Sequence, residues 1–156
     1  MYDTNMYERP WMIIMRGLPG SGKSTWIELD SSEYVNQRDF MIASADHYHI
    51  DENGVYNFDL KNQREAHTYC KNVALYACKT EHDVYIDNTN TQRWEFQYYL
   101  SLAKKYKYNV RVVRIHGIDP ETAFNRNVHG VPMDTLIKMN ERFEDFEGEE
   151  IFNAKH

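Results

Sequence analysis

One glycine-rich stretch constrains this chain more than any other feature. Residues 17–24 read GLPGSGKS and satisfy the phosphate-binding pattern of a glycine, any four residues and then Gly-Lys-Ser. A short apolar run at 11–15 precedes the stretch, and a segment able to open a helix begins at Ser24. In this setting backbone N–H groups and a helix N-terminus point at the phosphates. The stretch therefore predicts a binding site for a nucleoside triphosphate.

The residue types in the loop predict individual roles. Lys23 supplies positive charge to phosphate oxygens, and the Ser24 hydroxyl is a ligand for Mg²⁺. We therefore expect ATP and Mg²⁺ as cofactors. The residues expected to bind the nucleotide are Gly17, Pro19, Gly20, Ser21, Gly22, Lys23, Ser24 and Thr25.

Strand and helix patterns alternate along the rest of the chain. Strands are expected at 11–15, 39–44, 84–87 and 110–115, and helices from 24, at 61–79, at 93–105, from 119 and at 133–146. This alternation implies right-handed crossovers and a parallel sheet covered on both faces. We predict an α/β protein with a three-layer P-loop fold and a central parallel sheet. Its 156 residues fit one domain over 1–156, with loosely ordered ends at 1–9 and 149–156.

Two aspartates each follow a predicted strand, at the sheet edge where open parallel sheets bind their ligands. Asp87 suits the second carboxylate of P-loop proteins, which orients Mg²⁺ or its water shell. Asp46 suits the group that accepts the proton of an acceptor hydroxyl, although a helix cap or a turn is about as common for an aspartate here. Between them, residues 51–58 contain Asn53-Gly54, which predicts a tight turn and a small flap near the site.

Charge and composition limit the partners. The net charge is −6, and the acids gather near the C-terminus, so a broad basic surface for long duplexes is not expected. One basic cluster, formed by Lys104, Lys105, Lys107, Arg111 and Arg114, is more typical of the solvated end of a helix.

Several hydrophobic residues are expected to fill the core rather than to carry chemistry. Trp94, Tyr98 and Tyr99 lie at helical spacing and are predicted to pack rather than to stack on bases. Cys70 and Cys78 are predicted to be core residues without a disulfide. No apolar run reaches the length of a membrane span and no secretion signal is recognisable, so we expect a cytoplasmic protein with no membrane partner.

Four sequence blocks together resemble the polynucleotide-kinase-like P-loop kinases: residues 17–26, Asp46-x-Tyr48, residues 87–90 and residues 126–132. That family includes the bacteriophage 5′-hydroxyl polynucleotide kinases and kinase modules of eukaryotic Nedd-binding proteins. The resemblance covers residues 11–146. It implies a helical lid and transfer of the γ-phosphoryl group of ATP to a nucleic-acid 5′-hydroxyl, in the host cytoplasm if the protein is phage-encoded. It also implies that Lys23 is catalytic, that Asp46 is the general base and that Arg126 is the lid arginine.

The sequence departs from the family pattern at two places. Phage kinases carry an arginine three residues after the base to bind the acceptor phosphate, whereas this chain has His49. Their second acid directly precedes Thr-Asn, whereas Asn88 intervenes here. The acceptor therefore stays open between a polynucleotide end, a hydroxymethylated base in DNA and a small nucleoside-like molecule. A P-loop ATPase acting as a nucleotide-dependent switch is the alternative from another class. The aspartate and histidines at residues 46–49 could bind a transition metal, but the sequence has no second cluster that would complete four ligands.

Overall fold

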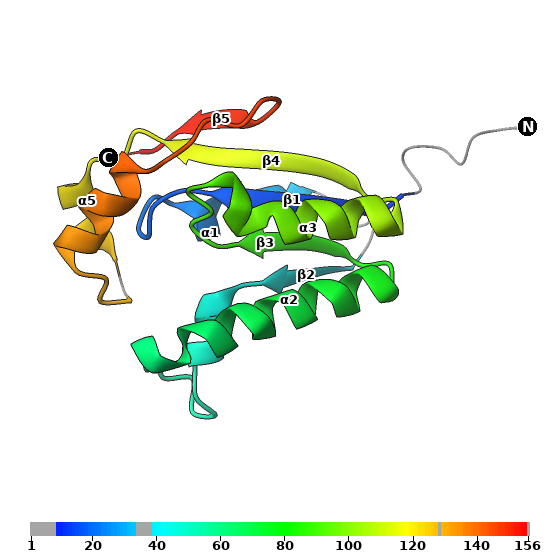
Figure 1. Ribbon diagram of the computed structural model, residues 1–156, viewed down its shortest axis with the longest axis horizontal. Helices are drawn as coiled ribbons and strands as arrows, with labels where there is room; N and C mark the ends of the chain where they lie inside the picture. Colours follow the sequence, from blue (N-terminus) through cyan, green and yellow to red (C-terminus); the bar gives the residue numbers. More distant parts are fainter. Residues whose placement is uncertain (1–8, 34–38, 128, 156) are drawn as a thin grey trace, which may run out of the picture.

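The fold is described by a computed structural model for residues 9–33, 39–127 and 129–155. It contains a five-stranded sheet in the order β2-β3-β1-β4-β5, and every neighbouring pair is parallel. The strands are β1 Trp11–Arg16, β2 Phe40–Ala43, β3 Asp83–Asp87, β4 Asn109–His116 and β5 Glu150–Asn153. All carboxyl ends therefore lie at one edge of the sheet, on the left in Figure 1.

Helices cover both faces of this sheet (Figure 1). The helices are α1 Lys23–Glu33, α2 Gln63–Lys79, α3 Arg93–Tyr106, α4 Pro120–Arg126 and α5 Met133–Glu141, and the short 3₁₀ helices are η2 Ala45–His49 and η3 Leu60–Asn62. Successive side chains of β1 point to opposite faces. Met12 and Ile14 pack with α2 and α3, whereas Ile13 and Met15 pack with Ile27 of α1. The predicted three-layer α/β fold is confirmed.

The helices α4 and α5 form a lid beyond the carboxyl edge of the sheet. Their small core contains Leu18, Ile118, Ala123 and Leu136. Helix α4 begins as predicted, since Asp119 accepts a hydrogen bond from the Thr122 backbone N–H at 2.8 Å and Pro120 occupies the first turn. Within the described residues, no helix is both long and apolar enough to cross a membrane.

The predicted helix over 133–146 is wrong beyond Glu141. The backbone N–H of Glu144 donates to the Thr91 carbonyl at 2.8 Å, and the Glu144 carbonyl accepts from Arg16 at 2.6 Å. These bonds draw the chain away from the helix axis and towards the sheet. Strand β5 follows at Glu150–Asn153, so the expectation of a loosely ordered end at 149–156 is wrong for the residues of this strand. Residues 1–8 and 156 of the expected loose ends lie outside the described part.

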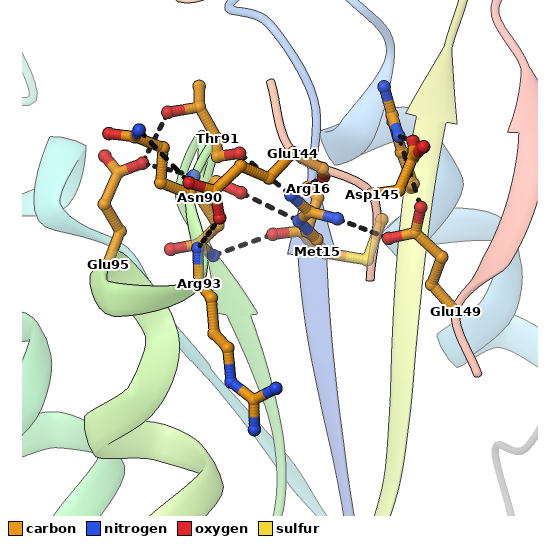
Figure 2. A network of polar contacts seen from close by, with 11 residues as sticks. Met15, Arg16, Asn90, Thr91, Arg93, Glu95, Glu144, Asp145 and Glu149 are labelled. Carbon is orange, nitrogen blue, oxygen red and sulfur yellow. Dashed lines mark hydrogen bonds and ion pairs between the residues drawn. The ribbon is translucent and has the colours of Figure 1, made fainter. Parts of the chain in front are cut away.

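A buried arginine explains why the acidic end of the chain is ordered (Figure 2). Arg16 has no exposed surface, and its guanidinium donates to the carbonyls of Asn90 and Thr91 at 2.8 and 2.9 Å and pairs with Glu149. Glu149 also lies 3.3 Å from Arg114 of β4. A carboxylate held by two arginines is neutralised, so the segment that reads as a solvated tail packs against the sheet.

The two cysteines are both buried and free, which confirms their predicted place in the core. Trp26 is partly buried against the α1 side of the sheet, where it meets Phe152 of β5 at a ring distance of 5.6 Å. The fifth strand therefore completes the packing of this face.

Candidate active site

The glycine loop connects β1 to α1 and lies directly under the lid. Gly20 has a φ of +82°, and a Cβ on it would lie 2.5 Å from the Ala123 carbonyl oxygen of α4. A larger residue would therefore be strained and would also push α4 away. Glycine at this position allows the phosphate-binding loop and the lid helix to touch.

The Lys23 side chain is folded back onto the loop. Its ammonium group donates to the carbonyls of Gly17 at 2.8 Å and Leu18 at 3.1 Å. Burial lowers the pKa of Lys23, and the nearby carboxylates of Asp87 and Asp46 oppose that shift. Both of these acceptors are neutral carbonyls, so the charge of the ammonium can act on an incoming phosphate.

Asp87 ends β3 beside the start of α1, and Ser24 Oγ donates to Asp87 Oδ2 at 3.4 Å. Mg²⁺ takes oxygen ligands at about 2.0–2.1 Å in octahedral geometry, which places neighbouring ligands about 3 Å apart. The two oxygens therefore fit a shared Mg²⁺. The Asn88 side chain is bound elsewhere: its Oδ1 accepts a hydrogen bond from the Ala45 backbone N–H at 3.0 Å, and its Nδ2 donates to the Cys70 sulfur. The geometry thus favours Asp87 over Asn88 as the residue that faces the metal.

Asp46 lies in η2 immediately after β2. The Ser44 hydroxyl caps this helix by accepting from the Asp46 N–H at 3.2 Å, so the alternative that Asp46 is the cap is wrong. The Asp46 side chain is half exposed. Tyr56 Oη donates to Asp46 Oδ1 at 3.4 Å, and His129 Nε2 lies 3.6 Å from Oδ2. The carboxylate is therefore approached from two sides.

These two neighbours bring the flap and the lid together at Asp46. The flap turns at Gly54 and closes with a bridge between Ile50 and Tyr56, as the Asn-Gly signal predicted. The rings of Tyr56 and His129 lie 4.4 Å apart. Burial, together with Asp46, raises the pKa of Tyr56. No local sequence pattern indicates that the turn containing His129 reaches Asp46.

Arg126 is the last residue of α4, and its guanidinium donates to the Lys155 carbonyl after β5. This partner is neutral, and among the described residues no carboxylate lies within ion-pair distance of Arg126. His49, in contrast, is buried, lies 3.1 Å from the Gln63 side chain and packs on Phe58. It is therefore covered by side chains of the flap and is not placed to bind a phosphate. The residues 46–49 also offer no shared metal site, since His47 is exposed while His49 is buried.

Most predicted site residues line one pocket of about 440 Å³. Gly17 and Ser21 do not line it, because Gly17 pairs with the backbone of Thr89 and Ser21 is buried beneath the loop. The predicted residues that the pocket brings together are Pro19, Gly20, Gly22, Lys23, Ser24, Thr25, Asp46, Asp87 and Arg126.

A second pocket of about 540 Å³ adjoins the first and lies between α2 and α3. Asp46, Asn88 and Thr89 line both pockets. Trp94 lines the second pocket and is 73% exposed, so the expectation that it packs in the core is wrong, whereas Tyr99 is buried as predicted. Helical spacing predicts that Trp94 and the aromatic residue one turn later lie on one side of α3. It does not predict which part of that side is covered by α2.

Comparisons with known proteins agree with this geometry. Residues 12–144 match the family described as AAA domain. Human NEDD4-binding protein 2 is 34% identical over 139 residues, which are 86% of this chain and 8% of that protein. The chain thus corresponds to a small part of this curated relative.

Two solved structures have similar folds. The Pnkp1/Rnl/Hen1 RNA repair complex aligns with a TM-score of 0.68 at 17% identity, over 92% of this chain and 47% of the other. The Mycobacterium tuberculosis APS kinase in complex with AMPPNP and APS aligns with a TM-score of 0.67 at 12% identity, over 95% and 90% of the two chains. The family match over most of the chain and this shared fold lead to one conclusion: the protein belongs to the AAA domain family and has the fold of the P-loop kinases.

Proposed function

We propose that the protein is an ATP-dependent kinase that transfers the γ-phosphoryl group to a hydroxyl of a nucleic acid, with a polynucleotide 5′-hydroxyl as the acceptor. The observation that carries the proposal is the position of Asp46, which lines both the pocket of the glycine loop and the pocket between α2 and α3. A carboxylate between a donor pocket and an acceptor pocket is where a kinase needs its base. An ATPase activates water and needs no second pocket.

The chain supplies a group for each part of the transfer. The acceptor oxygen forms a bond to the γ-phosphorus, the bond to the β–γ bridging oxygen breaks, and Asp46 takes the hydroxyl proton. Lys23 and Arg126 place positive charge beside the moving group. Ser24 and Asp87 are the residues that would hold Mg²⁺, which neutralises phosphate charge when bound.

The comparisons support the donor and the acceptor class. The M. tuberculosis structure contains AMPPNP, an ATP analogue, which supports ATP as the donor. The Pnkp1 structure belongs to an RNA repair complex, which supports a nucleic-acid acceptor. We expect the reaction to take place in the cytoplasm.

The test is transfer of labelled γ-phosphate from ATP to a panel of acceptors. The panel contains 5′-hydroxyl DNA, 5′-hydroxyl RNA, DNA with hydroxymethylated bases, free nucleosides and water. We expect label on a 5′-hydroxyl strand with at least tenfold preference over free nucleosides, as a few phosphate contacts would provide. Label only on a modified base or on a small molecule would replace the proposed acceptor. Release of free phosphate without any transfer would indicate the ATPase alternative.

A further inference from the structure

We propose that the groove between α2 and α3 binds the single-stranded end of the acceptor, with Arg64, Lys71 and Arg142 contacting its backbone phosphates and Trp94 stacking on its terminal base. This inference rests on the proposed kinase function and names the residues that select its substrate. All four side chains line the 540 Å³ pocket that shares Asp46 with the nucleotide pocket.

The cations of this groove differ from three arginines of the sheet in having no carboxylate partner among the described residues. Arg16, Arg111 and Arg114 each pair with a carboxylate. Within the described part of the chain, Arg64, Lys71 and Arg142 have no carboxylate within ion-pair distance. Three uncompensated cations at one groove of a protein with a net charge of −6 indicate an anionic ligand there.

The contacts of these residues hold them at the groove. Arg64 and Lys71 lie seven residues apart on α2, which is two helical turns along one face. The Lys71 ammonium lies 5.1 Å from the Tyr98 ring centre on α3. Arg142 uses its Nε to donate to Thr91 Oγ1 at 3.0 Å, so its two terminal nitrogens are available for a bidentate phosphate contact.

Among the described residues that line this groove, Glu95 is the one acid besides Asp46, and its carboxylate is already hydrogen-bonded. Glu95 accepts hydrogen bonds from the Thr91 hydroxyl and from the Gln92 backbone at the start of α3. Its charge therefore stabilises the helix N-terminus. Three cations therefore stand against two carboxylates in the groove, and one of these carboxylates is already bound at the helix start.

The aromatic part of the groove gives it a preference for nucleic acid over a simple phosphate. The indole of Trp94 is 73% exposed and is tethered by a 3.1 Å bond from its Nε1 to Gln92. A solvent-exposed ring fixed beside unpaired cations is the combination that binds single strands, because every base can stack on it. The three cations line the same pocket as Asp46, whereas His49 is buried and does not line it.

The test compares two triple variants with the same charge change. Arg64→Gln, Lys71→Gln and Arg142→Gln are combined in one protein, and Lys104→Gln, Lys105→Gln and Lys107→Gln are combined in the control. Binding of a fluorescein-labelled 5′-hydroxyl hexanucleotide is measured by anisotropy without ATP, at several salt concentrations. We expect log K to fall against log salt with a slope of about −2 in the wild type, as three phosphate contacts of a single strand would give. The groove variant should bind about tenfold or more weakly with a slope near zero, and the control should match the wild type.

Two further readouts address the base and the reaction. Trp94→Ala should weaken binding roughly tenfold while Trp94→Phe retains most of it, since either aromatic ring can stack. ATP affinity should be unchanged in every groove variant. If the groove variant binds the strand like the wild type, the proposal is overturned. If binding depends on the groove but no acceptor is phosphorylated, the proposed kinase function fails while the groove assignment stands. A wild-type slope of −6 or steeper would show a larger basic surface elsewhere and would contradict the proposal.

Discussion

The Asp46 carboxylate lies between residues that are far from it in the sequence. Its oxygens are 3.4 Å from Tyr56 Oη in the flap and 3.6 Å from His129 Nε2 in the lid. The Tyr56 hydroxyl donates to one oxygen of Asp46, and the His129 ring lies beside the other oxygen, so both neighbours restrict the orientation of the carboxylate. The role of Asp46 in proton transfer remains a prediction, and so does the role of Arg126 in binding the transferred phosphoryl group.

We predict that Asp46→Asn lowers kcat by roughly 10²–10⁴-fold and changes ATP affinity only slightly, because the amide keeps the shape but cannot accept the proton. Arg126→Ala should lower the whole pH–rate profile without changing its shape, since arginine stays charged throughout. Phosphate transfer between about pH 5 and 9, with ATP affinity measured separately, checks both. Normal turnover in Asp46→Asn would exclude it as the base.

At the scale of elements, the contact between the glycine loop and α4 connects nucleotide binding to the lid. Gly20→Ala should lower kcat, because the new Cβ meets Ala123 and displaces the helix that carries Arg126. The loss of kcat should be larger than in a control variant that has the same loss of stability. Gly117→Ala is the matched control: its φ is +86°, and a Cβ there has no atom within 4 Å. The control has the same backbone strain, about 1–3 kcal/mol, without the contact. Equal kcat values in the two variants would contradict the coupling.

The fifth strand is attached to β4 by an ion pair. Arg111 donates to both Glu150 oxygens at 2.8 and 2.9 Å, and these bonds lower the pKa of Glu150 below its usual value near 4.5. A carboxyl whose pKa is lower in the folded state contributes stability above its unfolded pKa and loses it as pH falls through the folded value. Wild type should therefore be slightly more stable than Glu150→Gln at pH 7, and the two should converge below about pH 4. Urea unfolding at several pH values measures this difference.

At the scale of the whole molecule, Arg16 joins β1, the connection from β3 to α3 and the C-terminal segment (Figure 2). We predict that Arg16→Met destabilises the protein by about 3–5 kcal/mol, because Glu149 is left buried without this partner. The melting temperature should fall by roughly 10 °C. The double variant Arg16→Met, Glu149→Gln should recover part of the loss, since the unpaired charge is gone. A single variant that melts like the wild type would show that the network is not a main support of the fold.

The sequence by itself determined the layered α/β fold and the position of the glycine loop at the edge of the sheet. The 17–24 loop, the strands at 11–15, 39–44, 84–87 and 110–115 and the helix start at Asp119 all follow from local patterns, because hydrophobic periodicity, glycine conformation and helix capping act over a few residues. The order of alternating elements then led to a parallel sheet through the handedness of its crossovers.

Only the tertiary structure decided the features that depend on distant partners. The residues after Glu141 read as a continuing helix and an acidic tail, but Arg16 and Arg114 neutralise Glu149 and allow β5 to form. The contact of His129 with Asp46, the burial of His49 and the exposure of Trp94 likewise depend on how the flap, the lid and α2 pack. Ion pairing and burial are properties of residues brought together from far apart, so local sequence carries no signal for them.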